Sequence, residues 1–265
     1  MKWSDVLEKT IAVAREAGAF IRKERQVFDL SNVELKGVND MVSYVDKQAE
    51  QIIVDQLAQI LPEAGFITEE GTSTVKGEVY NWIIDPLDGT TNFIHDLPFY
   101  SVSIGLQKND EIVMGVVYEI TRSECFYAFK GQGAYCNETP IRVSAAADLS
   151  SSLIATGFPY DTGGFTDVYL AILKSLTDNS HGFRRLGSAA LDLCYVACGR
   201  VEGYFQHNLK PYDVAGGLII VQEAGGLVSD FQGGSNYIFG GEMVATNGKI
   251  HAELLAQTKL MVLNS

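Results

Sequence analysis

Residues 82–93 read WIIDPLDGTTNF, an apolar run that passes directly into two aspartates and a small, hydroxyl-rich turn. The apolar start predicts a buried strand, whose rigid end would project Asp85 and Asp88. Pro86 restricts the backbone, and Gly89 lets it approach an anion closely. Hard divalent cations such as Mg²⁺ bind carboxylates of this kind, together with water and substrate phosphate. The stretch therefore favours phosphoryl chemistry beside a cation, although a DPxDG string alone is also typical of a surface turn.

Two other segments carry acidic residues in comparable settings. FITEEG places Glu69 and Glu70 after an apolar pair, which alone would suit an exposed charged turn. NLKPYDVAGG places Asp213 at the start of a small-residue helix, where a helix N-cap is the simplest interpretation. Two acidic groups on either side of one apolar strand nevertheless favour a metal site.

Composition narrows the class of protein. The 265 residues are 46% apolar and 20% charged, with a net charge of −13 and a sequence pI near 4.7. This acidic excess argues against direct nucleic-acid or anionic-membrane binding, so we expect neither partner. The four cysteines show no CxxC or Cys/His metal spacing, which favours reduced thiols. Because the N-terminal segment lacks a signal-peptide core and no apolar run is long enough to span a membrane, we expect a cytoplasmic protein.

Hydrophobic periodicity divides the chain into two halves. It predicts helices over the first twenty-odd residues and over 45–61, 166–176, 189–198, 214–224 and 250–256. Alternating patterns after residue 82 predict a strand meander, with a hairpin turn at Lys108–Glu111. We therefore expect an N-terminal α+β half, 1–147, with the EE and DPLDGTTNF motifs, and a C-terminal α/β half, 148–265, with PYDVAGG. No linker separates them, so they should pack as one catalytic unit.

The three acidic motifs resemble the signatures of the inositol monophosphatase family. Residues 182–205, GFRRLGSAALDLCYVACGRVEGYF, are similar to its bacterial branch, and the resemblance covers nearly the whole chain. It implies a layered αβαβα sandwich and Mg²⁺-dependent hydrolysis of phosphate monoesters by metal-activated water. It also implies two to three Mg²⁺ ions, with Glu69, Asp85, the Leu87 carbonyl, Asp88 and Asp213 as ligands and Asp46 near a third, weaker ion. Glu69 and Thr90 correspond to the catalytic residues that orient and deprotonate the attacking water.

The same resemblance implies the substrate-binding positions. They are Leu87, Asp88, Gly89, Thr90, Ala189, Gln206 and Arg184. Gln206 departs from the family pattern, because the inositol-specific members carry Glu there. A neutral amide keeps one acceptor and adds two donors, so the exchange either alters substrate preference or is neutral. Arg184 either binds anionic substrate near the site entrance or makes a structural ion pair.

The resemblance leaves several functions open. The leading prediction is conversion of myo-inositol 1-phosphate to inositol and phosphate. The alternatives are a phosphatase for fructose 1,6-bisphosphate, NADP or histidinol phosphate, or a transcription antitermination-type binding protein with secondary phosphatase activity. The resemblance also implies a homodimer, lithium sensitivity, and, for the last alternative, a transcription-factor partner.

Overall fold

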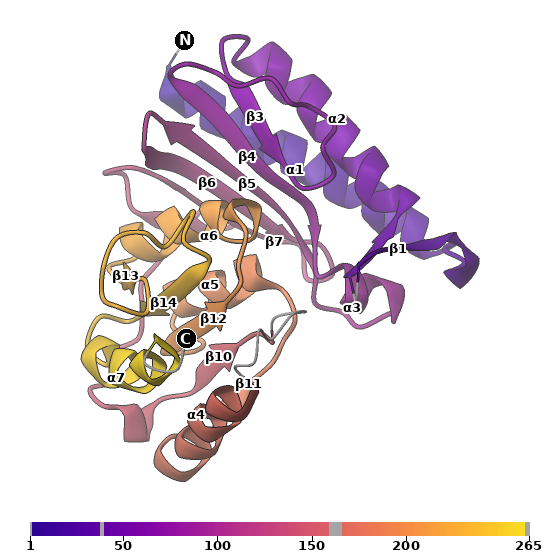
Figure 1. Ribbon diagram of the computed structural model, residues 1–265. Coiled ribbons are helices and arrows are strands. Elements are labelled where there is room, and N and C mark those ends of the chain that lie inside the picture. The colour runs from indigo at the N-terminus through magenta and orange to yellow at the C-terminus, as the bar shows by residue number, and fades with distance from the viewer. Residues whose placement is uncertain (1, 38–39, 159–165, 263–265) are drawn as a thin grey trace.

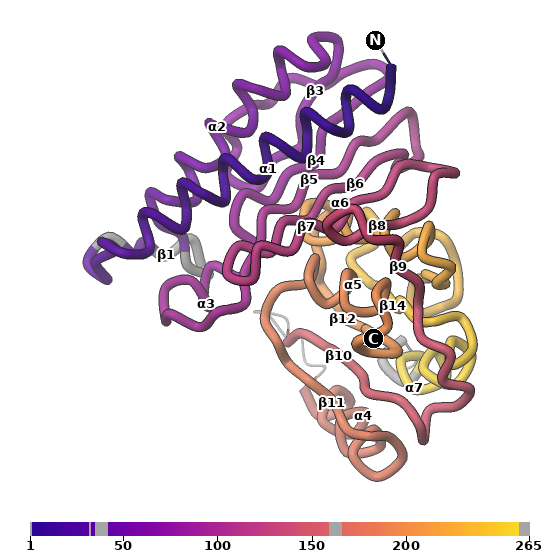
Figure 2. Tube along the Cα trace, turned by 180° about the vertical axis from the view of Figure 1, so that it is seen from behind, coloured from indigo at the N-terminus to yellow at the C-terminus, as the bar shows by residue number. Residues whose placement is uncertain are grey.

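Two long helices cover the outer face of a large sheet. The protein is described by a computed structural model over residues 2–37, 40–158 and 166–262. Helices α1 (Trp3–Arg25) and α2 (Tyr44–Ile60) lie side by side across the sheet, as Figures 1 and 2 show. Between them come the 3-10 turn η1 (Leu30–Asn32) and an antiparallel pair, β1 (Val33–Gly37) and β2 (Asp40–Ser43). Both helices bury the apolar stripes that predicted them.

The first sheet has the strand order β3–β4–β5–β6–β7–β8–β9. Its strands are β3 (Gly65–Thr68), β4 (Tyr80–Asp88), β5 (Ser101–Lys108), β6 (Glu111–Glu119), β7 (Glu124–Phe129), β8 (Ala134–Cys136) and β9 (Thr139–Ile141). β3 runs parallel to β4, and the other neighbouring pairs are antiparallel. This confirms the predicted meander and its hairpin between β5 and β6.

A middle layer of helices packs against the other face of this sheet. It contains α5 (Ala189–Ala197) and α6 (Pro211–Glu223), and α6 contacts β4 to β7. A Cβ atom on Gly115 of β6 would lie 2.2 Å from the carbonyl oxygen of Gly216 in α6. The backbones of strand and helix therefore touch, which explains why PYDVAGG continues into small residues.

A smaller mixed sheet lies beyond these helices, in the order β11–β10–β12–β14–β13. Its strands are β10 (Ile154–Thr156), β11 (Phe183–Arg184), β12 (Gly203–His207), β13 (Leu227–Ser229) and β14 (Glu242–Thr246). Helices α4 (Thr166–Asn179) and α7 (His251–Val262) cover its outer face, and the 3-10 turn η2 (Leu149–Ser151) precedes β10. The sequence patterns do not predict β12, whose five residues form the central strand of this sheet.

The layers follow the order helix, sheet, helix, sheet, helix, so the predicted αβαβα sandwich is confirmed (Figure 1). One core cluster joins residues of both sheets to α5 and α6. The division into halves at 147/148 falls between β9 and η2, and it stays a prediction. Within the described residues, the structure has no helix that is both long and apolar enough to cross a membrane.

Candidate active site

The end of β4 is irregular at the two predicted aspartates. Asp85 lies opposite Ser103 and Asp88 opposite Ser101, so three steps along β4 face two steps along β5. Such bulges redirect side chains and are common beside active sites. The backbone N–H of Leu87 donates to Asp85 Oδ1 at 3.0 Å, which fixes that carboxylate. Both aspartates are buried, at 3% and 9% exposure.

The chain then turns sharply at Gly89 into the short helix α3 (Thr90–Ile94). Gly89 has φ +100°, and a Cβ atom there would lie 3.0 Å from the Phe99 carbonyl oxygen, so the turn requires glycine. The Thr90 hydroxyl lies 2.9 Å from Asp46 Oδ1 and 3.0 Å from the Leu87 carbonyl oxygen. Because a hydroxyl has one proton, it can donate fully to one of these acceptors at a time.

Asp46 joins α2 to this turn. Its Oδ2 accepts from the Ser43 N–H at 2.9 Å and from the Ser43 hydroxyl at 2.7 Å, which forms a capping box at the start of α2. Burial raises the pKa of Asp46, while the hydrogen bonds from Ser43 and Thr90 oppose that rise. The contact between Thr90 and Asp46 was not expected from the sequence, and the expected cooperation of Thr90 with Glu69 stays a prediction.

The turn that carries Glu69 and Glu70 is held by a buried carboxylate on α2. Glu50 accepts from the backbone N–H of Glu70 and of Thr72, each at 2.8 Å. The sequence analysis missed this role. Its signal is the spacing of Asp46 and Glu50, which places two acids one turn apart on the apolar face of the predicted helix.

Asp88 ties the first sheet to the middle helices. It accepts from the Ser188 hydroxyl at 2.5 Å and from the N–H groups of Ala190 and Ala189 at 2.7 and 3.2 Å. These donors form the N-terminal turn of α5, whose dipole favours a carboxylate. Burial raises the pKa of Asp88 to about 6, with the hydrogen bonds opposing the shift. The predicted substrate position Ala189 thus lies directly beside Asp88.

The fourth carboxylate comes from the start of α6. Asp213 Oδ2 accepts from the Lys210 N–H at 2.6 Å, so this residue does cap its helix. Its charge, with those of Glu69 and Asp88, raises the pKa of Asp85, after burial as the first cause. The structure therefore brings together the acidic cluster, which we define as Glu69, Asp85, Asp88 and Asp213.

The acidic cluster suits a hard divalent cation. Its donors are oxygen atoms, and its members oppose one another's ionisation, a repulsion that a cation would relieve. In the described part of the chain, no three or more His, Cys, Asp or Glu side chains are arranged so that they could together hold a metal ion. Mg²⁺ commonly uses only one or two carboxylates per ion and completes its shell with water and phosphate. The oxygen donors of the acidic cluster are compatible with such an ion.

The two neighbouring arginines have different surroundings. Arg184 is exposed and donates to the carbonyl of its neighbour Phe183 at 2.8 Å. The guanidinium of Arg185 lies over Gly187, where an added Cβ atom would come within 2.7 Å of its Nη1. Its positive charge acts to lower the pKa of Asp88. Arg185 is therefore the arginine whose charge reaches Asp88, and the alternation of side chains along an extended segment directs the two arginines to opposite sides.

Gln206 lies near the end of β12. Its amide Oε1 accepts from the Tyr204 hydroxyl at 2.9 Å, and its side chain rests against the backbone of Gly157. Tyr204 is fully buried, and burial followed by the charges of Asp192, Asp213 and Asp88 raises the pKa of its hydroxyl, so the charge of the acidic cluster reaches this pair.

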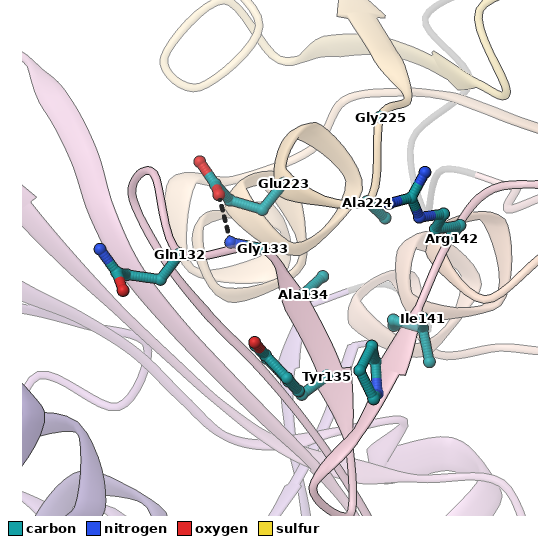
Figure 3. Close-up of a pocket in the computed structure, with 10 residues that line it drawn as sticks. Gln132, Gly133, Ala134, Tyr135, Ile141, Arg142, Glu223, Ala224 and Gly225 are labelled. Atoms are coloured by element: carbon teal, nitrogen blue, oxygen red, sulfur yellow. Dashed lines mark hydrogen bonds between the residues drawn. The ribbon is translucent and has the colours of Figure 1, made fainter.

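A pocket of about 440 Å³ lies at the other end of α6 (Figure 3). Ala134 and Ile141 form part of its apolar wall, and Arg142 lies at its edge. The Glu223 carboxylate accepts from the N–H groups of Gly131 and Gly133, each at 2.8 Å. No member of the acidic cluster lines this pocket, so it is separate from the candidate active site.

Comparisons with known proteins agree with the motifs. A family model described as the inositol monophosphatase family matches residues 2–261. The Nus factor SuhB of Salmonella typhimurium (strain 14028s) is 45% identical over 253 residues, which cover 94% of this chain and 95% of that protein. The extragenic suppressor protein suhB of Bartonella henselae has a similar structure, with a TM-score of 0.91, 38% identity, and coverage of 96% and 98%. An inositol monophosphatase from Anabaena gives a TM-score of 0.87 and 36% identity, with coverage of 98% and 97%.

Proposed function

Because the chain belongs to the inositol monophosphatase family, we propose that it hydrolyses small phosphate monoesters with Mg²⁺, with myo-inositol 1-phosphate as the leading substrate. The observation that carries the proposal is the convergence of the acidic cluster. Burial and the charges of Glu69, Asp88 and Asp213, which together with Asp85 come from the three sequence motifs, raise the pKa of the buried Asp85 carboxylate. We further propose a cytoplasmic homodimer, on the grounds of the family and of the bacterial relatives named Nus factor SuhB.

Together, the four carboxylates of the acidic cluster would hold two or three Mg²⁺ ions, with the Leu87 carbonyl as a further ligand and Asp46 near the third ion. When bound, Mg²⁺ supplies Lewis acidity that activates water and offsets charge on the phosphate. The protein's own contribution is positional. Asp46 holds the Thr90 hydroxyl at the rim of the site, where with Glu69 it would orient the attacking water and accept its proton.

The first experiment is a measurement of phosphate release. The panel contains myo-inositol 1-phosphate, fructose 1,6-bisphosphate, NADP, 2′-AMP and histidinol phosphate, each with and without Mg²⁺. We expect inositol phosphate to lead and activity to require the metal. If another ester leads, the chemistry stands but the pocket is different; if none is hydrolysed in Mg²⁺, the proposed function is wrong.

The variant Asp213→Asn tests the acidic cluster with little risk to the fold. The amide oxygen can still accept from the Lys210 N–H and so keep the cap of α6. We expect kcat/KM to fall by at least about 100-fold, because one charged ligand is lost. The exposed Asp178→Asn on α4 is the matched control and should retain full turnover. Near-wild-type turnover in Asp213→Asn would contradict the assignment of this ligand.

A second, binding role is a candidate because curated relatives carry the name Nus factor SuhB. A transcription-factor partner would then recognise the folded protein independently of hydrolysis. The same Asp213→Asn variant separates the roles when it is expressed in a bacterium that lacks the corresponding relative. Growth rescue by the inactive variant would support the binding role, and failure of rescue would tie the phenotype to hydrolysis.

A further inference from the structure

The amide of Gln206 is held in one orientation. The buried Tyr204 hydroxyl donates to Oε1 at 2.9 Å. Gly157 leaves space for the amide, since an added Cβ atom at 157 would come within 1.7 Å of Oε1. Because the oxygen is committed to Tyr204, the free end of the amide is its NH₂ group, which can only donate hydrogen bonds.

A second donor group borders the same region. The Arg185 guanidinium lies over Gly187, next to Ser188, whose hydroxyl donates to Asp88. Its positive charge also acts on Tyr169, which donates to the carbonyl oxygen of Gly157. Tyr169 and Gln206 both contact Gly157, so the charge of Arg185 reaches the part of the structure in which Gln206 lies. We call Arg185 and Gln206 the donor wall.

The donor wall differs chemically from a wall that carries a carboxylate. A carboxylate accepts from substrate hydroxyls and repels substrate anions, whereas amide and guanidinium N–H groups favour an acceptor, most strongly a charged one. Guanidinium forks match carboxylate geometry especially well. Substrate hydroxyls can still accept from these donors through their lone pairs, so polyol phosphates are not excluded.

We propose that the donor wall makes the protein favour, between two otherwise matched small phosphate monoesters, the one whose alcohol moiety carries a carboxylate. This inference rests on the proposed function, and Gln206 is its specificity-determining residue. 3-Phosphoglycerate and glycerol 3-phosphate form a matched pair of substrates, since they differ only by a carboxylate in place of a hydroxymethyl group. We expect the wild type to have the higher kcat/KM for 3-phosphoglycerate, with the difference mainly in KM.

The variant Gln206→Glu tests the wall directly. One carboxylate oxygen would accept from Tyr204, and the other would repel the substrate carboxylate. We expect the ratio of the two kcat/KM values to shift by about tenfold towards glycerol 3-phosphate. Tyr204→Phe frees the amide to turn and should reduce the wild-type preference. Gln132→Glu, an exposed change of the same kind on the β7–β8 turn, should leave the ratio unchanged.

Binding provides a readout that does not depend on turnover. Phosphonate analogues of both esters cannot be hydrolysed, and calorimetry in Mg²⁺ should give the same order of Kd values and the same reversal in Gln206→Glu. An unchanged ratio in Gln206→Glu, in both assays, would overturn the donor wall while leaving the phosphatase intact. If no ester is hydrolysed, the proposed function fails, and the phosphonate affinities still decide whether the wall prefers a carboxylate.

Discussion

At the residue scale, the contact between Thr90 and Asp46 is the most informative one in the site. It joins a hydroxyl on the turn after β4 to a carboxylate on α2, 44 positions earlier in the chain. Ser43 saturates the second oxygen of Asp46, so the first is left to hold Thr90. When the Thr90 hydroxyl donates its proton to Asp46, its oxygen remains able to accept a hydrogen bond from a water molecule.

Substitution of Thr90 tests that role. Thr90→Val keeps the shape but removes the hydroxyl, and we expect kcat to fall by about 100-fold, as for loss of a general acid–base partner. Thr90→Ser should retain much more activity because it restores the bond to Asp46. Thr177→Val on α4 removes a hydroxyl that bonds only within its helix and serves as the control. Equal kcat in the Val and Ser variants would show that the hydroxyl has no part in the reaction.

The sequence predicts the acidic residues of the site better than it predicts their partners. Asp85 and Asp88 stand out because they interrupt an apolar strand. Glu50 and Arg185 do not, since their roles depend on which turn or carboxylate the fold brings against them. Such pairings join segments far apart in the chain, and no local pattern encodes them.

At the element scale, three helix N-termini meet at the site with a carboxylate each. Asp46 lies in the first turn of α2, Asp213 in the first turn of α6, and Asp88 caps α5 from outside. The two interpretations of Asp213, cap and ligand, are therefore compatible. Backbone N–H groups orient these carboxylates and partly offset their charge, so the helices can gather negative groups without a cation.

The elements themselves follow sequence periodicity where they are long. The expected helix 45–61 is found as α2, and the segment expected as 189–198 is α5. Strand β12 and helix α3 escape prediction, because five residues carry too little periodicity and tertiary contacts determine their conformation.

The start of α7 contains a pH-sensitive contact that affects stability. His251 is buried, with Nε2 3.0 Å from the Ser229 hydroxyl and Nδ1 3.0 Å from that of Thr246. Burial lowers the pKa of His251, so folding favours the neutral ring. A lowered pKa means that the unfolded state binds more protons, and this contribution to stability is lost as pH falls through the unfolded pKa of about 6.5.

The comparison of wild type with His251→Gln isolates this contribution. At about pH 7.5 the variant should be less stable by about 1–3 kcal/mol, because one buried hydroxyl loses its partner. The gap in the free energy of unfolding should narrow towards about pH 5.5, where the wild type must protonate or strain its histidine. Urea unfolding at both pH values measures it, with the exposed His181→Gln as control. A gap that widens at low pH would contradict the sign of this argument.

At the scale of the whole molecule, the site lies where the layers meet. β4 supplies Asp85 and Asp88, α2 supplies Asp46, and α6 brings Asp213 from the C-terminal part of the chain. Close backbone packing between α6 and β6 fixes the position of that helix. The acidic cluster thus depends on the sandwich as a unit, and its mutual repulsion acts against the folded state of a chain with a net charge of −13.

Cation binding should therefore stabilise the entire fold. A ligand that binds only the native state adds about 2.7 kcal/mol at a concentration of 100 Kd, so we expect Tm to rise with Mg²⁺ and not with NaCl of equal ionic strength. Asp85→Asn removes one buried charge; without metal it should unfold at a Tm equal to or above that of the wild type, and it should lose most of the Mg²⁺ response. The exposed Asp178→Asn should keep the wild-type response. Calorimetric scans decide the matter independently of any substrate: an Mg²⁺ response that survives in Asp85→Asn would place the cation away from the acidic cluster.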